Sequence, residues 1–205
     1  MNRPLPPQEL LEPEAVIFPV VKPAPEIRAW AHETFIAGEG ELYNPIHAHL
    51  IDSDVEFMWA STAFTKKGRT VLGQCEQVML RAGGWQKVRL EQQFRDWFGR
   101  VPKFLITIAA DYSADCSDTE FCALVEHEMM HIAQATDEYG APKFNQEGMP
   151  VLTIRGHDVE EFIDIVKRYG ANHEVQQMVD AANGKPEVAK TNIARACGTC
   201  IRSVA

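Results

Sequence analysis

Residues 127–131 read His-Glu-Met-Met-His and lie within an apolar run that extends from Phe121 to Ala133. In an α-helix, positions i and i+4 lie about 40° apart around the axis and one turn along it, so two imidazoles can converge on one metal ion. Glu128 lies about 60° from His131 on the same side, beside the place of a water molecule on that metal. The spacing therefore predicts a Zn2+ site with His127 and His131 as ligands and Glu128 as general base.

The residues before this motif predict where its helix begins. Ser117 can cap a helix, and Glu120 follows three residues later, as in a capping box. Leu124, Glu128 and His131 then fall on one stripe of the helix. We therefore expect the two histidines to be half-buried on an amphipathic helix rather than scattered in a loop.

A catalytic zinc ion needs three protein ligands and an open position for water, so the motif is incomplete by itself. His157 follows Gly156 at the start of a second amphipathic helix that we predict over residues 155–166, and it is the favoured third ligand. A glutamate could serve instead. The other candidates are Glu160, Glu161 and His173, while Asp158 or the same glutamates could orient an imidazole through its other nitrogen.

The chain has 205 residues, of which 45% are hydrophobic, which suits one domain with a real core. No apolar run approaches the roughly 20 residues that span a bilayer, and prolines interrupt the N-terminus, which lacks a signal-peptide form. We therefore expect a cytoplasmic protein that does not bind a membrane. The net charge of −9 argues against a general phosphate-binding surface. The basic residues within 81–100 indicate either a solvated helix face or a nucleic-acid contact.

Three parts are predicted along the chain. Residues 1–25 hold seven of the twelve prolines and are expected to form an extended arm. Residues 26–182 are predicted to form an α+β domain, and residues 183–205 a polar tail. Within the domain, apolar spacing predicts helices over 26–37, 47–60, 86–98 and 175–182, and strands over 70–75 and 104–110.

The strand predicted over residues 104–110 directly precedes the motif helix. A strand beside a metal helix could offer its edge to an extended peptide, which is how a sheet commonly holds a peptide backbone.

The five cysteines form an odd set without the density of a secreted disulfide scaffold. Cys197 and Cys200 form a Cys-x-x-Cys pair, which supplies two of the four ligands of a structural zinc ion. Three alternatives remain open: half a site completed by a second chain, a redox pair, or two thiols in a loose tail. The other cysteines could contribute to a zinc site with the pair only if the tail folds back; they are Cys75, Cys116 and Cys122.

Several segments of the chain resemble a known family, the putative phage metallopeptidases, which are small zincin-like proteins. The resemblance covers roughly residues 26–172. A looser resemblance links His157 and Phe162 to a segment of the SprT-like metalloproteases. The segments that carry the main resemblance are Trp97-Phe98-Gly99, Phe104 to Ile108, Ala123 to His131, Gly140 to Phe144, Gly156 to Phe162 and Arg168-Tyr169-Gly170.

This resemblance implies a single zincin-like domain, with a small sheet, an active-site helix and a second helix that supplies the third ligand. It implies zinc on His127, His131 and His157, Glu128 as base, and a peptide or protein substrate. The oxyanion of the reaction would need a further donor, for which Tyr139, Arg155 and Tyr169 are candidates. The alternative is an accessory binding protein with a structural or idle zinc site, in which a protein side chain fills the fourth position.

Overall fold

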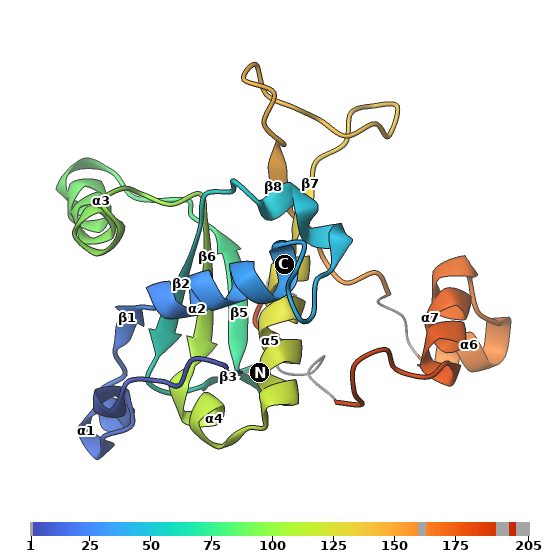
Figure 1. The fold of residues 1–205 in the computed structure, drawn as a ribbon, viewed down its shortest axis with the longest axis horizontal. Coiled ribbons are helices and arrows are strands. Elements are labelled where there is room, and N and C mark those ends of the chain that lie inside the picture. The colour runs from blue at the N-terminus through green and yellow to red at the C-terminus, as the bar shows by residue number, and fades with distance from the viewer. Residues whose placement is uncertain (1, 160–162, 192–196, 200–205) are drawn as a thin grey trace.

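The computed structural model describes residues 2–159, 163–191 and 197–199 (Figure 1). Its centre is a four-stranded sheet with the strand order β1-β2-β6-β5. The strands are β1 (Val21–Pro23), β2 (Val55–Ala60), β5 (Gly73–Gln77) and β6 (Phe104–Ala109). β2 and β6 run parallel, and β1 and β5 run antiparallel to their neighbours. The expected α+β class is confirmed, and β5 lies at one edge of the sheet.

Alternating apolar side chains of the two central strands form one wall of the core. Phe57 and Trp59 of β2 and Ile106 and Ile108 of β6 are all buried, and residues two apart on a strand face the same side. The strand predicted over 104–110 is therefore confirmed as β6, one residue shorter at its end. Its position in the middle of the sheet corrects the idea that it offers an edge, because β5 pairs with it on the outer side.

Two helices pack against this wall. They are α2 (Pro25–Ala31), which continues as the π-helical turn η2 (His32–Ile36), and α5 (Asp118–Met130). Figure 1 shows α2 and α5 on the same side of the sheet, and the rings of Trp30 and Phe121 lie 5.3 Å apart between them. Leu124 and Val125 of α5 are fully buried. The motif helix is thus part of the core and has a fixed position.

The prediction of a helix over residues 47–60 is wrong. Those residues form the end of the 3-10 helix η3 (Pro45–Leu50) and then the central strand β2. A buried helix and a buried strand both place many apolar residues in a short run. Periodicity distinguishes the two poorly when the strand is buried on both faces. The alternation of Val55, Phe57 and Trp59 is the signal that favours a strand.

The proline-rich residues 1–25 differ from the expected extended arm. They contain η1 (Gln8–Leu10), α1 (Pro13–Ile17) and β1, which joins the sheet beside β2. Leu10 is fully buried, and the Arg3 Nε–H donates to Asp118 over 2.8 Å at the start of α5. Within residues 1–25, β1, Leu10 and Arg3 therefore contact the rest of the described structure.

Further helices and strands complete the described structure. The basic helix predicted over 86–98 is confirmed as α3 (Gly84–Phe98), and none of its residues is buried. The helix predicted over 175–182 is α7 (His173–Asn183). Within the described residues, no helix combines the length and apolar character needed to cross a membrane. The other elements are β3 (Phe64–Lys66), β4 (Arg69–Val71), α4 (Ala110–Asp115), β7 (Ile132–Gln134), β8 (Leu152–Ile154) and α6 (Ile163–Tyr169).

Candidate metal centre

The motif helix α5 begins with the predicted capping box. The Ser117 hydroxyl accepts from the Glu120 N–H, and the Glu120 carboxylate accepts from the Ser117 N–H over 2.8 Å. Starting from this cap, the helix carries His127 in its last turn and ends so that His131 is its C-cap residue. The two imidazole centroids lie 5.1 Å apart, which is close enough for their nitrogens to converge on one ion.

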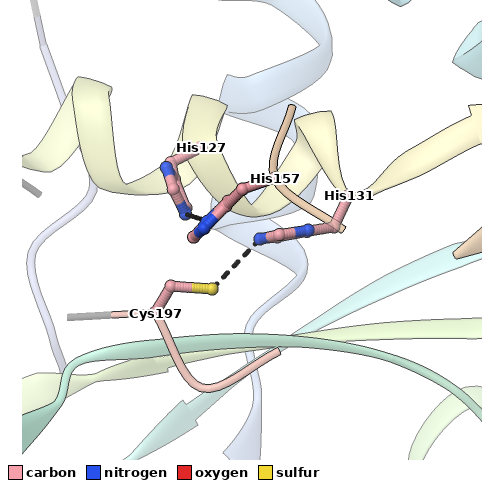
Figure 2. Close-up of side chains that lie close together, drawn as sticks. All are labelled: His127, His131, His157 and Cys197. Carbon is pink, nitrogen blue, oxygen red and sulfur yellow. Dashed lines mark hydrogen bonds between the residues drawn. The ribbon is translucent and has the colours of Figure 1, made fainter. Parts of the chain in front are cut away.

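His157 reaches the same point, but from a different kind of element than expected. It lies in a non-helical segment after β8, and the helix described downstream, α6, begins only at Ile163. The idea that a second helix supplies this histidine is therefore corrected. Its Nε2 lies 3.1 Å from Nε2 of His127 (Figure 2). The structure thus brings together all three histidines that the sequence singled out.

Backbone pairing between the end of α5 and β8 explains how His157 is placed. β7 follows the helix directly and pairs antiparallel with β8 in the register Ile132↔Ile154. The hairpin continues past the strands, because the Arg155 N–H donates to the carbonyl oxygen of His131 over 2.9 Å. This pairing holds His157, two residues later, against the last turn of α5.

Cys197 supplies a fourth donor beside the three imidazoles. Its Sγ lies 3.0 Å from Nε2 of His131, and its side chain is buried (Figure 2). The nitrogen and sulfur donors of His127, His131, His157 and Cys197 all lie within 4.8 Å of one another. The sequence patterns do not predict Cys197 in this site. The only sequence signal was the Cys-x-x-Cys pair, and its partner Cys200 lies outside the described residues.

The donor chemistry of this cluster fits zinc. Tetrahedral zinc with Zn–N bonds of about 2.0–2.1 Å requires its nitrogen ligands to lie roughly 3.3 Å apart. The 3.1 Å between Nε2 of His157 and Nε2 of His127 is close to that separation. Imidazole and thiolate are also the ligands that zinc prefers over magnesium or calcium.

Burial favours the neutral state of His127 and His131, which is the state that binds a metal. Burial, followed by the charges of His131 and His157, lowers the pKa of His127 from 6.5 to about 4. Burial also lowers the pKa of His131. Both imidazoles are then deprotonated near neutral pH, so a metal ion does not have to compete with protons for their nitrogens.

Glu128 lies next to the cluster and is fully buried. Burial raises the pKa of its carboxyl from 4.5 to about 7, although hydrogen bonds from Thr199 and Cys197 oppose the rise. Its Oε2 lies 3.1 Å from the Thr199 hydroxyl, while Oε1 has no hydrogen-bond partner among the described residues. A carboxyl whose pKa lies near neutrality can both accept and return a proton, as a general base requires.

The other candidates for ligands and donors lie elsewhere. Glu160 and Glu161 fall outside the described residues, and His173 is exposed at the start of α7. Tyr139 and Tyr169 are 86% and 73% exposed, which does not favour either as an oxyanion donor. Arg155 lines the same cleft as the three histidines, and its Nε–H donates to the carbonyl oxygen of Met130 over 3.0 Å.

The basic residues of the 81–100 segment are largely paired with carboxylates. Arg95 and Lys87 lie 3.0 and 3.8 Å from Glu91. Arg100 lies 2.6 Å from Asp54 and 2.8 Å from Glu56. These pairs are typical of a solvated surface.

The fold and the cluster define an α+β protein with a histidine-based candidate metal centre at the end of a core helix. The chain belongs to the family described as putative phage metallopeptidase, whose family model matches residues 28–183. This match contains His127, Glu128, His131 and His157 and ends before Cys197. No curated protein and no solved structure gave a match to the chain. The family name indicates a metal-dependent peptidase.

Proposed function

We propose that the protein is a zinc metallopeptidase in which His127, His131 and His157 hold the ion and Glu128 is the general base. The observation that carries the proposal is the convergence of three imidazoles on one point, with a buried carboxylate beside them. A bound zinc ion would supply Lewis acidity that polarises the scissile carbonyl and makes a water molecule more acidic. The protein itself would transfer the protons and align the peptide.

Glu128 would take the proton of the attacking water and return it to the leaving amine. The carboxyl pKa of about 7 suits both transfers, because a base that titrates near the working pH binds and releases a proton with similar ease. The outer edge of β5 would align an extended peptide, because β5 is an edge strand and Gly73 brings its backbone against Glu128. The substrate would then lie between this edge and the end of α5.

The test compares zinc content and casein hydrolysis of the wild type and Glu128→Gln. Glutamine has nearly the same shape but does not accept a proton at neutral pH. We expect zinc content to be unchanged and kcat/KM to fall by about 10²–10⁴-fold, the usual contribution of a general base. Undiminished hydrolysis by the variant would refute this role of Glu128.

One observation favours a second candidate, an accessory binding protein with a closed structural zinc site. Cys197 stands where a catalytic zinc site keeps an open position, and four protein ligands are typical of structural sites. In that case no variant of the site would hydrolyse peptides, and loss of any ligand would unfold the domain.

A further inference from the structure

We propose that the segment Cys197–Thr199 is a built-in inhibitor of this site, with the Cys197 thiolate as a displaceable fourth metal ligand and the segment's backbone in the place of a peptide substrate. The inference rests on the proposed function, since it assigns a regulation to the same site. Cys197 lies beyond residues 28–183, so the family match carries none of it.

The segment binds the edge of the sheet where a peptide would bind. Cys197 forms a parallel bridge with Gly73, and the Gly198 N–H donates to the carbonyl oxygen of Gly73 over 2.8 Å. The Thr199 hydroxyl accepts from the Cys75 N–H over 2.7 Å and lies 2.8 Å from the Cys75 carbonyl oxygen. The described part of the tail thus uses the β5 hydrogen-bonding groups that an added strand would use.

The fit of this segment depends on a glycine. A Cβ at Gly198 would lie 2.6 Å from Cγ1 of Val71 and 3.0 Å from Cβ of Gln74. Val71 is itself buried, so it has little room to move away. A side chain at position 198 would therefore lift the segment from β5 while leaving the thiol of Cys197 intact.

The segment also covers the general base. The Thr199 hydroxyl lies 3.1 Å from Glu128 Oε2, and Cys197 Sγ lies 3.9 Å from the same oxygen. With the segment in place Glu128 is fully buried, and a base in that position has no approach for a water molecule. The resting arrangement is therefore closed at the metal and at the base together.

The state of Glu128 distinguishes an inhibited enzyme from a purely structural zinc site. Its Oε1 is buried without a hydrogen-bond partner among the described residues, an arrangement that destabilises a fold. A structural zinc site does not require a buried carboxylate oxygen without a hydrogen-bond partner, whereas a general base needs an oxygen that can accept a proton from water. Opening requires only that the metal–sulfur bond breaks, that the sulfur takes a proton from water, and that the segment leaves β5.

The experiment uses the full chain with cobalt(II) in place of zinc, together with Cys197→Ala and Gly198→Ala. Cys116→Ala is the matched control, because this cysteine lies outside the metal cluster and its Sγ makes a long contact of 3.7 Å with the Ser113 carbonyl oxygen. Three quantities are measured: the thiolate-to-cobalt charge-transfer absorption, the spectral change on adding acetohydroxamic acid, and hydrolysis of labelled casein by the zinc forms.

We expect the wild type and Cys116→Ala to show the charge-transfer band and to resist acetohydroxamate. Cys197→Ala should keep one metal per chain, lack the band and bind acetohydroxamate. Casein hydrolysis by Cys197→Ala should rise about 10–100-fold if the open form of the wild type is a minor state of roughly 1–10%. Gly198→Ala should bind acetohydroxamate and hydrolyse casein faster than the wild type does, although its thiol is present.

Other results would overturn the proposal in separable ways. A wild type without the band, or one as active as Cys197→Ala, refutes the inhibitor and leaves the peptidase in place. Variants that bind acetohydroxamate but never hydrolyse casein refute the peptidase itself, and with it the inhibition. If Cys197→Ala and Gly198→Ala both lose metal and unfold, the site is structural.

Discussion

His131 and Arg155 are joined by two hydrogen bonds, one from the His131 imidazole and one to the His131 backbone. The His131 Nδ1–H donates to the Arg155 carbonyl oxygen over 2.8 Å, and the Arg155 N–H donates back to the His131 carbonyl oxygen over 2.9 Å. Because a carbonyl oxygen only accepts, Nδ1 must carry the proton, which leaves the lone pair of Nε2 directed at the cluster. The two hydrogen bonds thus orient a proposed metal ligand and anchor the segment that carries His157.

Arg155→Ala should lower zinc affinity by less than the roughly 10–100-fold effect of losing a direct partner of a metal ligand. The variant keeps the backbone contacts to His131 but loses the bond from Nε to the Met130 carbonyl oxygen, so the His157 segment is less firmly held. Competition with a chromogenic chelator measures the affinity. Lys143→Ala, at an exposed lysine of the loop between β7 and β8, is the control and should not change it.

His157→Ala should lower zinc affinity by more than the roughly 10–100-fold effect of an outer partner, because it removes a proposed ligand. Metal content after purification without added zinc, followed by titration, measures the loss. His173→Ala removes an exposed histidine that was an alternative third ligand, and it should retain one zinc per chain. Equal zinc content and affinity in the two variants would contradict the assignment.

Removal of zinc by a chelator should lower the thermal stability of the domain. A ligand that binds only the folded state adds about 2.7 kcal/mol when its concentration is 100 times its Kd. Calorimetry of the apo and zinc-loaded forms measures the shift in Tm. Magnesium should not restore the Tm, because imidazole and thiolate donors suit zinc and not magnesium. A Tm that is the same with and without zinc would show that the cluster holds no metal in the folded state.

Gly73→Ala should destabilise the domain by about 1–3 kcal/mol, the usual cost of overpacking a core. Its Cβ would lie 2.9 Å from Cγ of Glu128 and 3.0 Å from Cδ1 of Leu124, and both side chains are fully buried. Urea denaturation measures the free energy of unfolding. Gly38→Ala is the matched control, since a Cβ there meets nothing within 4 Å. Equal losses in both variants would contradict the packing explanation.

Ser117→Ala should cost about 1 kcal/mol of stability, because it removes the N-cap of the motif helix. Hydrogen bonds from the Ser117 N–H and hydroxyl lower the pKa of Glu120 below 4.5. A carboxyl whose pKa is lower in the folded state stabilises the protein at pH values above its unfolded-state pKa. This stabilisation is lost as the pH falls through the folded-state pKa. The difference between variant and wild type in urea denaturation should therefore shrink in acid. Thr119→Ala, outside the capping box, should show no such pH dependence.

Local sequence patterns predicted the parts of the site that lie on one element. Ser117 and Glu120 mark the start of α5, and the helical spacing places His127 and His131 together, because both features depend on residues within one or two turns. The same reasoning failed for residues 47–60, where a buried strand and a helix share the same apolar composition. It also assigned a helix to the segment of His157, which is held in a non-helical conformation by pairing with His131.

The sequence by itself determined the cap of the motif helix, the proposed ligand pair with the proposed base beside it, and the third histidine as a candidate. Only the tertiary structure decided that His157 meets His127, that β5 rather than β6 lies at the edge, and that Cys197 lies beside His131. These contacts join residues that are 30 and 66 positions apart. No local period encodes such distances, because they follow from the order of the strands in the sheet and from the hydrogen bonds between their backbones.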